Sequence, residues 1–279
     1  MKAAQARVLL TGATGGIGRA IAAELLQHGA AVLLTGRSPA RLAALSRALA
    51  PTAVLQSRVA WHATDLDDAA ALPLLCEAAV AWQANVLVNN AGTSSFGRLE
   101  TLGADHLEQV LRTNLLAPMR LTQALLPWLR SRPQAQVIQI GSVLGRLGLP
   151  GYSVYSASKF GLRGFSEALR RELRGSPVRV QYLGPRSTRT AFNDARVDAY
   201  NRATSTATDS PETVARALLE LLQSGAAERF LGLPEKHAVR LNGLAPELLD
   251  GAFDKHRASL PPGPAEAPAS IRIPVETLS

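Results

Sequence analysis

The stretch RVLLTGATGGIG, residues 7–18, decides the fold of this chain. Its first four residues are typical of a buried strand, its centre is rich in glycine, and an amphipathic helical pattern covers Gly16–His28. Each glycine has a use here: Gly12 permits a tight turn, Gly16 lets the backbone approach a phosphate, and Gly18 lets the helix pack closely. Because a helix N-terminus carries free N–H groups and partial positive charge, the stretch predicts a pyrophosphate-binding turn.

The alternation of strand and helix continues outward from this turn. Longer amphipathic stretches separate short apolar runs, and the expected strands are Arg7–Leu10, Ala31–Thr35, Val59–Ala63, Val86–Val88, Val137–Ile140 and Val178–Leu183. Strands that alternate with helices of this length form parallel sheets covered on both faces. The expected fold class is therefore α/β, a Rossmann-type doubly wound parallel sheet with right-handed crossovers.

The rest of the chain has a weaker pattern. Leu102–Arg130 predicts one long or two short helices with a kink at Pro118, and Thr190–Ser210 is polar, with no element expected. Pro211–Gln223 predicts a helix, and Phe230–Leu233 is a candidate last strand. We divide the chain into a dinucleotide-binding catalytic domain (1–233), a C-terminal helical extension that acts as a lid or docking element (234–260) and a Pro-rich mobile tail (261–279).

Composition excludes several classes of protein. The chain has 279 residues, of which 47% are hydrophobic, so a sizeable core is expected. Its only cysteine is Cys76, no apolar run reaches the ~18–20 residues of a membrane-spanning helix, and the first residues lead into a strand and not a signal peptide. The net charge of +8 is spread along the chain, and the histidines have no ligand-like spacing. We expect a cytoplasmic protein with no metal and no nucleic-acid partner.

The end of the second strand indicates which dinucleotide binds. An NAD-specific enzyme carries an acidic residue there to hold the ribose 2′-hydroxyl, whereas this strand leads into Gly36 and Arg37. Arg37 can pair with a 2′-phosphate, and Arg41 is a second candidate. Asp65, after the third strand, is a candidate for the adenine amino group or for the cap of the next helix. The sequence therefore predicts NADP.

Chemistry-bearing motifs follow at the ends of the later strands. NNAG occupies residues 89–92, Ser142 follows the fifth strand, YSASK occupies residues 155–159, and Asn114 lies in a helical stretch. Over roughly residues 5–190 this set resembles the classical short-chain dehydrogenase/reductase family. The glycine turn also fits the TGxxGxxG pattern of the extended branch, the sugar-nucleotide epimerases and dehydratases, but NNAG and the short chain favour the classical branch.

The resemblance implies a catalytic set of Ser142, Tyr155, Lys159 and Asn114. Tyr155 and Lys159 are four residues apart and share a helix face, where an ammonium lowers the pKa of a phenol. In the implied reaction Tyr155 is the general acid/base, Ser142 donates to the carbonyl oxygen, Lys159 also holds the nicotinamide ribose, and Asn114 supports a proton-relay water.

Two further sets of residues are expected. The cofactor-binding residues are Gly12, Thr14, Gly15, Gly16, Ile17, Gly18, Arg37, Asp65, Leu66, Asn89, Ala91, Gly92, Tyr155, Lys159, Pro185, Thr188 and Thr190. The substrate-binding residues are Ser142, Leu144, Leu149, Tyr155, Arg186 and Phe192.

The chain departs from the family pattern at two positions. Arg186 follows Pro185 where the family has glycine, and a side chain is strained there if φ is positive. Arg186 therefore follows an altered loop path or reaches a substrate carboxylate or phosphate. Gly141 replaces a common serine before Ser142.

The expected function is the NADPH-dependent reduction of an apolar ketone or aldehyde, such as a ketoacyl thioester or a fatty, aromatic or polycyclic carbonyl compound. The alternatives are a non-catalytic NADP-binding sensor and an epimerase or dehydratase of the extended branch. The resemblance implies a homodimer or homotetramer through the helices that carry Asn114 and Tyr155. The segment 234–258 is a candidate for docking on a membrane or a carrier protein.

Overall fold

The computed structural model describes residues 1–261, apart from the side chains of Pro234, Lys236 and Leu248. The tail expected at 261–279 therefore lies, beyond its first residue, outside the described residues.

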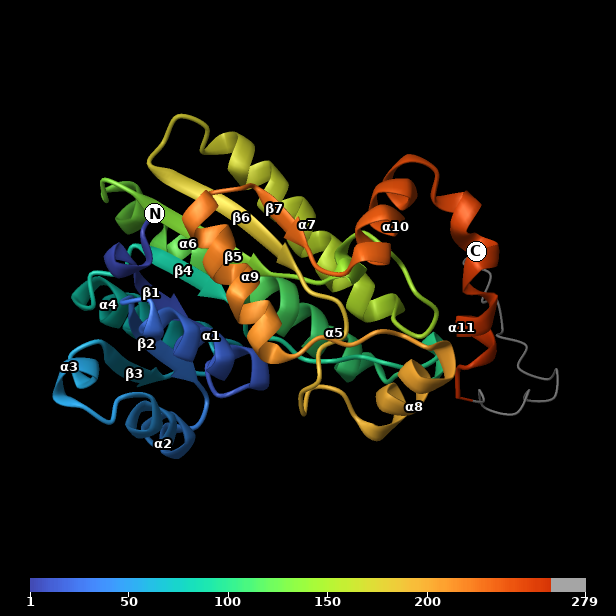
Figure 1. The fold of residues 1–279 in the computed structure, drawn as a ribbon, viewed down its shortest axis with the longest axis horizontal. Coiled ribbons are helices and arrows are strands. Elements are labelled where there is room, and N and C mark those ends of the chain that lie inside the picture. Colours follow the sequence, from blue (N-terminus) through green and yellow to red (C-terminus); the bar gives the residue numbers. More distant parts are fainter. Residues whose placement is uncertain (262–279) are drawn as a thin grey trace, which may run out of the picture.

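A seven-stranded parallel sheet forms the centre of the molecule, with the order β3-β2-β1-β4-β5-β6-β7 (Figure 1). The strands are β1 (Arg7–Leu10), β2 (Ala31–Gly36), β3 (Val59–Ala63), β4 (Val86–Asn89), β5 (Ala135–Ile140), β6 (Val178–Gly184) and β7 (Glu228–Phe230). The expected fold class is confirmed. Because β2 and β4 flank β1 and the chain winds away on either side, a crevice is expected at the carboxyl ends of β1 and β4.

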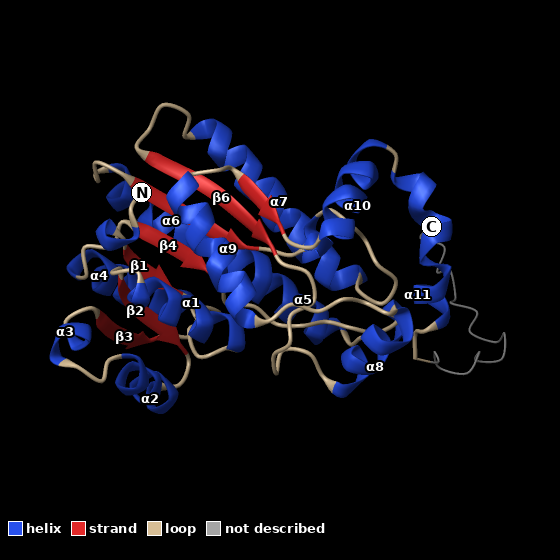
Figure 2. Ribbon diagram, viewed as in Figure 1, coloured by secondary structure: helices blue, strands red, loops and turns tan. Residues whose placement is uncertain are grey.

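Helices cover both faces of the sheet, as Figure 2 shows. They are α1 (Gly16–Gln27), α2 (Pro39–Leu49), α3 (Ala53–Gln56), α4 (Leu72–Ala81), α5 (Ala104–Leu111), α6 (Ala117–Arg130), α7 (Ser153–Glu172), α8 (Ala195–Thr204), α9 (Pro211–Ser224), α10 (Leu233–Leu244) and α11 (Asp254–Ala258). Val8 and Leu10 pack with α1 and α9, whereas Leu9 between them packs with α4 and α6 on the other face. The alternation follows from the two-residue period of a strand, and it explains why the buried strands are apolar throughout.

The long helical stretch before β5 is interrupted by a π-helical turn, Arg112–Leu116, which contains Asn114. Pro118 lies in the first turn of α6, where its missing N–H costs no hydrogen bond. The regular α-helix is therefore interrupted before Pro118 and not at it, by the kind of π-helical turn that is frequent in functional sites.

The structure adds α8 to the stretch 190–210, which was expected to have no element. Asp194 caps α8, and Val197 and Tyr200 are its buried apolar side chains. Three helical elements follow β7: α10, a 3-10 segment (Pro246–Phe253) and α11. The chain leaves the helical conformation between Leu244 and Pro246, where α10 ends and the 3-10 segment begins. Among the described residues no helix has the length and apolarity needed to span a membrane.

Candidate active site

The glycine turn lies between β1 and α1, at the crevice. Gly12 has a φ of +63°, and a Cβ there would lie 2.8 Å from the Cα of Ala91. A Cβ on Gly18 would lie 2.3 Å from the carbonyl oxygen of Gly12, so both positions require glycine. Gly15 is the N-cap of α1 and no side chain caps this helix, which leaves first-turn N–H groups available to an anion. Ile17 packs against the core under α1.

Thr190, from the loop after β6, covers this turn. A Cβ on Gly16 would lie 2.5 Å from Cγ2 of Thr190, so the glycine lets the Thr190 side chain lie directly against the turn. The uncapped N-terminus of α1 beside it fits the pyrophosphate of a dinucleotide, which needs backbone N–H donors.

Asn90 braces the glycine turn, and sequence reasoning missed it. Its amide nitrogen Nδ2 donates to the carbonyls of Thr11 (2.9 Å) and Gly12 (3.2 Å). The Oγ1 of Thr11 accepts hydrogen bonds from the backbone N–H groups of Asn90 and Ala91, both at 2.9 Å. Asn89, the predicted cofactor ligand, is buried and donates to Oγ1 of Thr122 on α6. Of the two asparagines in the NNAG motif, the second reaches the turn with its side chain, and cofactor binding by Asn89 stays a prediction.

The corner after β2 is basic. Arg41 and Arg19 both donate to the carbonyl of Thr14, at 3.2 Å and 3.0 Å, and Arg37 is exposed at the end of the strand. A Cβ on Gly36 would lie 3.6 Å from Oγ1 of Thr14, so the strand end and the turn are adjacent. The three guanidinium groups give this corner the charge that attracts a phosphate.

Asp65 lies at the neighbouring strand end. Its carboxylate accepts the backbone N–H of Asp67 at 3.1 Å, whereas Asp68 caps the following 3-10 turn at the N–H of Ala70. Asp65 is exposed, and Leu66 beside it packs on the core. The helix-capping alternative for Asp65 is therefore excluded.

The catalytic candidates meet at the carboxyl end of β5. Lys159 is buried, and its Nζ donates to the carbonyl of Ile140 at 3.2 Å, one residue before Gly141. The same Nζ lies 5.6 Å from the centroid of the Tyr155 ring. Ser142 is buried, and its hydroxyl accepts the N–H of Leu144 at 3.1 Å. The structure thus brings together three residues that are separated in sequence.

The electrostatics of this cluster are dominated by burial. Burial raises the pKa of the Tyr155 phenol, and a hydrogen bond with the Ser142 side chain acts in the opposite direction. Burial lowers the pKa of Lys159 from 10.5 to about 8. That Lys159 lowers the pKa of Tyr155 stays a prediction.

Asn114 is buried within the π-helical turn, and its hydrogen bonds hold the loop after β4 in place. Its Oδ1 accepts the N–H of Thr93 at 2.7 Å, and its Nδ2 donates to the carbonyl of Thr93 and to Oγ of Ser158. A Cβ on Gly92 would lie 3.1 Å from Oδ1 of Asn114 and 3.8 Å from Nζ of Lys159. Asn114 and Gly92 therefore lie beside the Lys159 ammonium, and a proton relay through Asn114 stays a prediction.

The loop after β6 continues this surface. The carbonyl of Pro185 accepts the N–H of Val143 at 2.8 Å and lies 3.3 Å from Oγ of Ser142. Thr188 is buried, and its hydroxyl donates to the carbonyl of Arg186. The loop is thereby tied to the segment that carries the catalytic serine.

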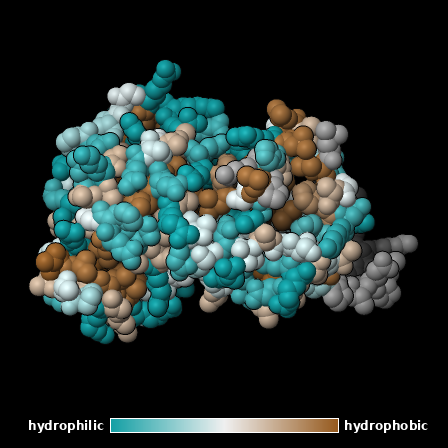
Figure 3. All heavy atoms as spheres, in the orientation of Figure 1, coloured by the Kyte–Doolittle hydropathy of each residue, from teal (hydrophilic) through white to brown (hydrophobic). Residues whose placement is uncertain are grey.

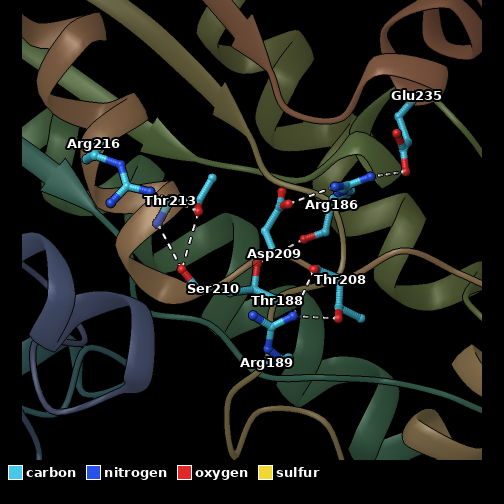
Figure 4. Close-up of polar contacts among 9 residues, drawn as sticks. All are labelled: Arg186, Thr188, Arg189, Thr208, Asp209, Ser210, Thr213, Arg216 and Glu235. Carbon is cyan, nitrogen blue, oxygen red and sulfur yellow. Dashed lines mark hydrogen bonds and ion pairs between the residues drawn. The ribbon is translucent and has the colours of Figure 1, made fainter.

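Arg186 makes two ion pairs (Figure 4). Its guanidinium lies 2.8 Å from Oδ1 of Asp209 and 3.3 Å from Oε1 of Glu235, which comes from the first turn of α10. Arg186 is not among the described residues with positive φ, so its side chain causes no left-handed strain. Neither expectation for this position, an altered loop path or a substrate contact, described these ion pairs, in which the guanidinium is engaged within the chain. A substrate contact by Arg186 stays a prediction.

Aromatic rings flank Tyr155. The Tyr152 and Phe192 rings lie 6.3 Å and 6.2 Å from it, centroid to centroid, both edge to face. Phe192 is 41% exposed. Leu144 is buried in the cluster that Leu149 also packs against. Tyr152, before α7, and Phe192, from the loop after β6, therefore meet at the Tyr155 ring.

Comparisons with known proteins agree with this geometry. Residues 6–201 match the short chain dehydrogenase family. The chain is 36% identical over 185 residues to Dehydrogenase/reductase SDR family member 7B of Mus musculus. This alignment covers 64% of this chain and 56% of the relative. It is 32% identical over 223 residues to Ketoacyl reductase HetN of Nostoc sp., covering 79% of this chain and 76% of that relative.

Among solved structures, the actinorhodin polyketide ketoreductase with NADPH superposes with a TM-score of 0.73 at 26% identity, covering 83% of this chain and 97% of that one. The glycine turn and the cluster of Ser142, Tyr155 and Lys159 lie within residues 6–201, the region that matches the family. The chain therefore belongs to the classical short-chain dehydrogenases/reductases, oxidoreductases that use a nicotinamide cofactor and act on small molecules.

Proposed function

We propose that this chain reduces an apolar ketone or aldehyde to an alcohol with NADPH. The observation that carries the proposal is the Tyr155 phenol, with Ser142 close enough to lower its pKa and the Lys159 ammonium 5.6 Å from the centroid of its ring. A bound nicotinamide supplies hydride to the carbonyl carbon. Tyr155 donates the proton to the carbonyl oxygen, and Ser142 stabilises the negative charge that develops there.

Tyr155 holds its proton at neutral pH and is therefore present in the form that donates. Burial by itself makes the phenol a weaker acid, so proton transfer depends on groups that stabilise the phenolate. Lys159, with a pKa near 8, is still mostly protonated at pH 7 and favours the phenolate left behind.

The preference for NADPH is proposed on the basic corner after β2. No carboxylate follows this strand in the sequence, and Arg37, Arg41 and Arg19 surround the Thr14 carbonyl or the strand end. A 2′-phosphate would gain charge-assisted hydrogen bonds there, whereas the 2′-hydroxyl of NADH has no acidic partner.

The substrate class is proposed from the rings beside Tyr155. Tyr152 and Phe192 offer apolar and aromatic surface to the reacting carbonyl. The relative from Nostoc is named a ketoacyl reductase, and the superposed structure is a polyketide ketoreductase, both of which support a ketone substrate.

The experiment is a titration with NADPH and NADH followed by a turnover panel. The panel contains an acetoacetyl thioester, octanal and acetophenone, with Tyr155→Phe and Arg37→Ser as variants. We expect NADPH to bind at least about tenfold tighter than NADH, Arg37→Ser to remove most of that difference, and Tyr155→Phe to lose more than about 99% of turnover. Tight NADPH binding without turnover would favour the sensor alternative, and a preference for NADH would contradict the role of Arg37.

A further inference from the structure

Tyr182 lies behind the catalytic serine and is not part of the family pattern described above. It is a residue of β6 that is 2% exposed, and the Phe230 ring packs against it with centroids 5.8 Å apart. Its hydroxyl accepts the backbone N–H of Ser142 at 3.0 Å and donates to the backbone carbonyl of Ser142 at 3.0 Å. One side chain thus pairs with both backbone groups of the catalytic serine, whose carbonyl also accepts the N–H of Gly145 at 3.0 Å.

These two hydrogen bonds replace a missing strand partner. Ser142 is extended, with φ of −163° and ψ of 163°, but it lies beyond the end of β5, where the ladder has stopped. A buried N–H without a partner costs about 1–3 kcal/mol, so the N–H of Ser142 needs the acceptor that Tyr182 provides. A hydroxyl can donate one hydrogen bond and accept another, which suits it to pair with both groups.

Two glycines make room for this hydroxyl. A Cβ on Gly141 would lie 1.9 Å from Cζ of Tyr182, and a Cβ on Gly145 would lie 2.0 Å from its Oη. Any side chain at either position would displace the end of a rigid ring that is fixed by its packing. The glycine before Ser142 therefore has a physical reason, because Tyr182 occupies the space of its side chain.

We propose that Tyr182 is a positioning residue that holds the backbone of Ser142 so that its hydroxyl meets the Tyr155 phenol and the substrate oxygen. This inference rests on the proposed reductase function. Catalysis by a hydrogen-bond donor depends on placement within a fraction of an ångström, so a shift of the Ser142 backbone lowers the rate of the chemical step. Binding of cofactor, which Ser142 does not hold here, is unaffected.

The test compares Tyr182→Phe with the wild type, using NADPH and the best carbonyl compound of the panel above. The phenylalanine keeps the ring and its packing and removes only the hydroxyl. We expect kcat to fall about tenfold or more, while the KM for the carbonyl and the Kd for NADPH stay within about twofold. In the reverse oxidation of the alcohol, the rising limb of the pH–rate profile moves to higher pH, because a displaced Ser142 no longer lowers the pKa of Tyr155.

Gly141→Ala is the second variant, and it serves if Tyr182→Phe does not fold. The added methyl group at position 141 would displace the Tyr182 hydroxyl while leaving Tyr182 unchanged, so the variant is expected to reproduce the loss in kcat. Gly103→Ala is its matched control, since a Cβ on Gly103 would meet nothing within 4 Å. A folded Tyr182→Phe enzyme with kcat within about twofold of the wild type would overturn the positioning role and leave the reductase function intact. A wild type that turns over no member of the panel would overturn the proposed function, and this inference with it.

Discussion

Burial at the site of chemistry has a consequence that can be measured at a single residue. Lys159 is 4% exposed, and burial lowers its pKa from 10.5 to about 8. In the unfolded chain the same lysine keeps its ordinary pKa. Between pH 8 and 10.5 the unfolded state therefore binds more protons than the folded state, and the free energy of unfolding rises with pH through this window.

The prediction is that wild type gains about 2 kcal/mol of unfolding free energy relative to Lys159→Met between pH 7.5 and pH 10. Methionine matches the length of the lysine stem and cannot titrate. Urea unfolding of the cofactor-free proteins at the two pH values measures the difference. Lys2→Met, at an exposed site, is the matched control. Parallel changes in Lys159→Met and wild type would show that the folded lysine titrates normally.

At the residue scale, the catalytic candidates could be predicted from the sequence, whereas the residues that hold them in place could not. Ser142, Tyr155 and Lys159 could be identified because the family pattern contains them, and the structure brings them together at the end of β5. Asn90 was overlooked although it stands within NNAG, since sequence does not tell which of two neighbouring asparagines points to the turn. Tyr182 was not predictable, because only the folded sheet brings it to Ser142.

The elements differ in how well they could be predicted. The apolar runs located six strands within about two residues, because a buried parallel strand leaves a continuous hydrophobic signal. Helix α8 was missed, since only Val197 and Tyr200 carry its apolar face and its cap, Asp194, was not recognised. Short, polar helices depend on tertiary packing, which a sequence pattern does not show.

The ion pairs of Arg186 connect three elements and give a second prediction. Arg186 links the loop after β6 to Asp209, before α9, and to Glu235 on α10. These side chains are 11–20% exposed, so removing the guanidinium leaves two half-buried carboxylates without a partner. We expect Arg186→Leu to lower the free energy of unfolding by about 2 kcal/mol, as measured by chemical denaturation.

Arg196→Leu is the matched control for that measurement. Arg196 pairs with Asp194 at 2.8 Å, but the two side chains are 66% and 49% exposed. An exposed pair contributes less than about 1 kcal/mol, because solvent screens it. Equal losses in the two variants would mean that Arg186 adds nothing beyond a surface ion pair.

At the scale of the whole molecule, two of the surfaces with exposed apolar side chains are candidates for association. On α10, Leu233, Leu241 and Leu244 are 74%, 42% and 86% exposed, and Figure 3 shows hydrophobic atoms over this helix. The opposite side of α10 is anchored, since Val239 is buried against the cluster of Val143. Docking of the segment 234–258 on a membrane or carrier stays a prediction.

The second surface combines α5, the π-helical turn and α7, the elements through which the family resemblance implies a dimer. Leu111, Leu116 and Phe160 on these elements are 40%, 38% and 42% exposed. A two-fold interface counts each residue twice, and burying one large apolar side chain contributes about 1.5–3 kcal/mol. We predict that the protein is at least dimeric and that Phe160→Glu weakens the self-association by about 100-fold or more, measured by analytical ultracentrifugation across a concentration series.

Leu244→Glu adds the same charge to the other apolar surface and is expected to leave the association unchanged. A wild type that sediments as a monomer at all concentrations, or a dimer lost in Leu244→Glu and kept in Phe160→Glu, would place the interface elsewhere.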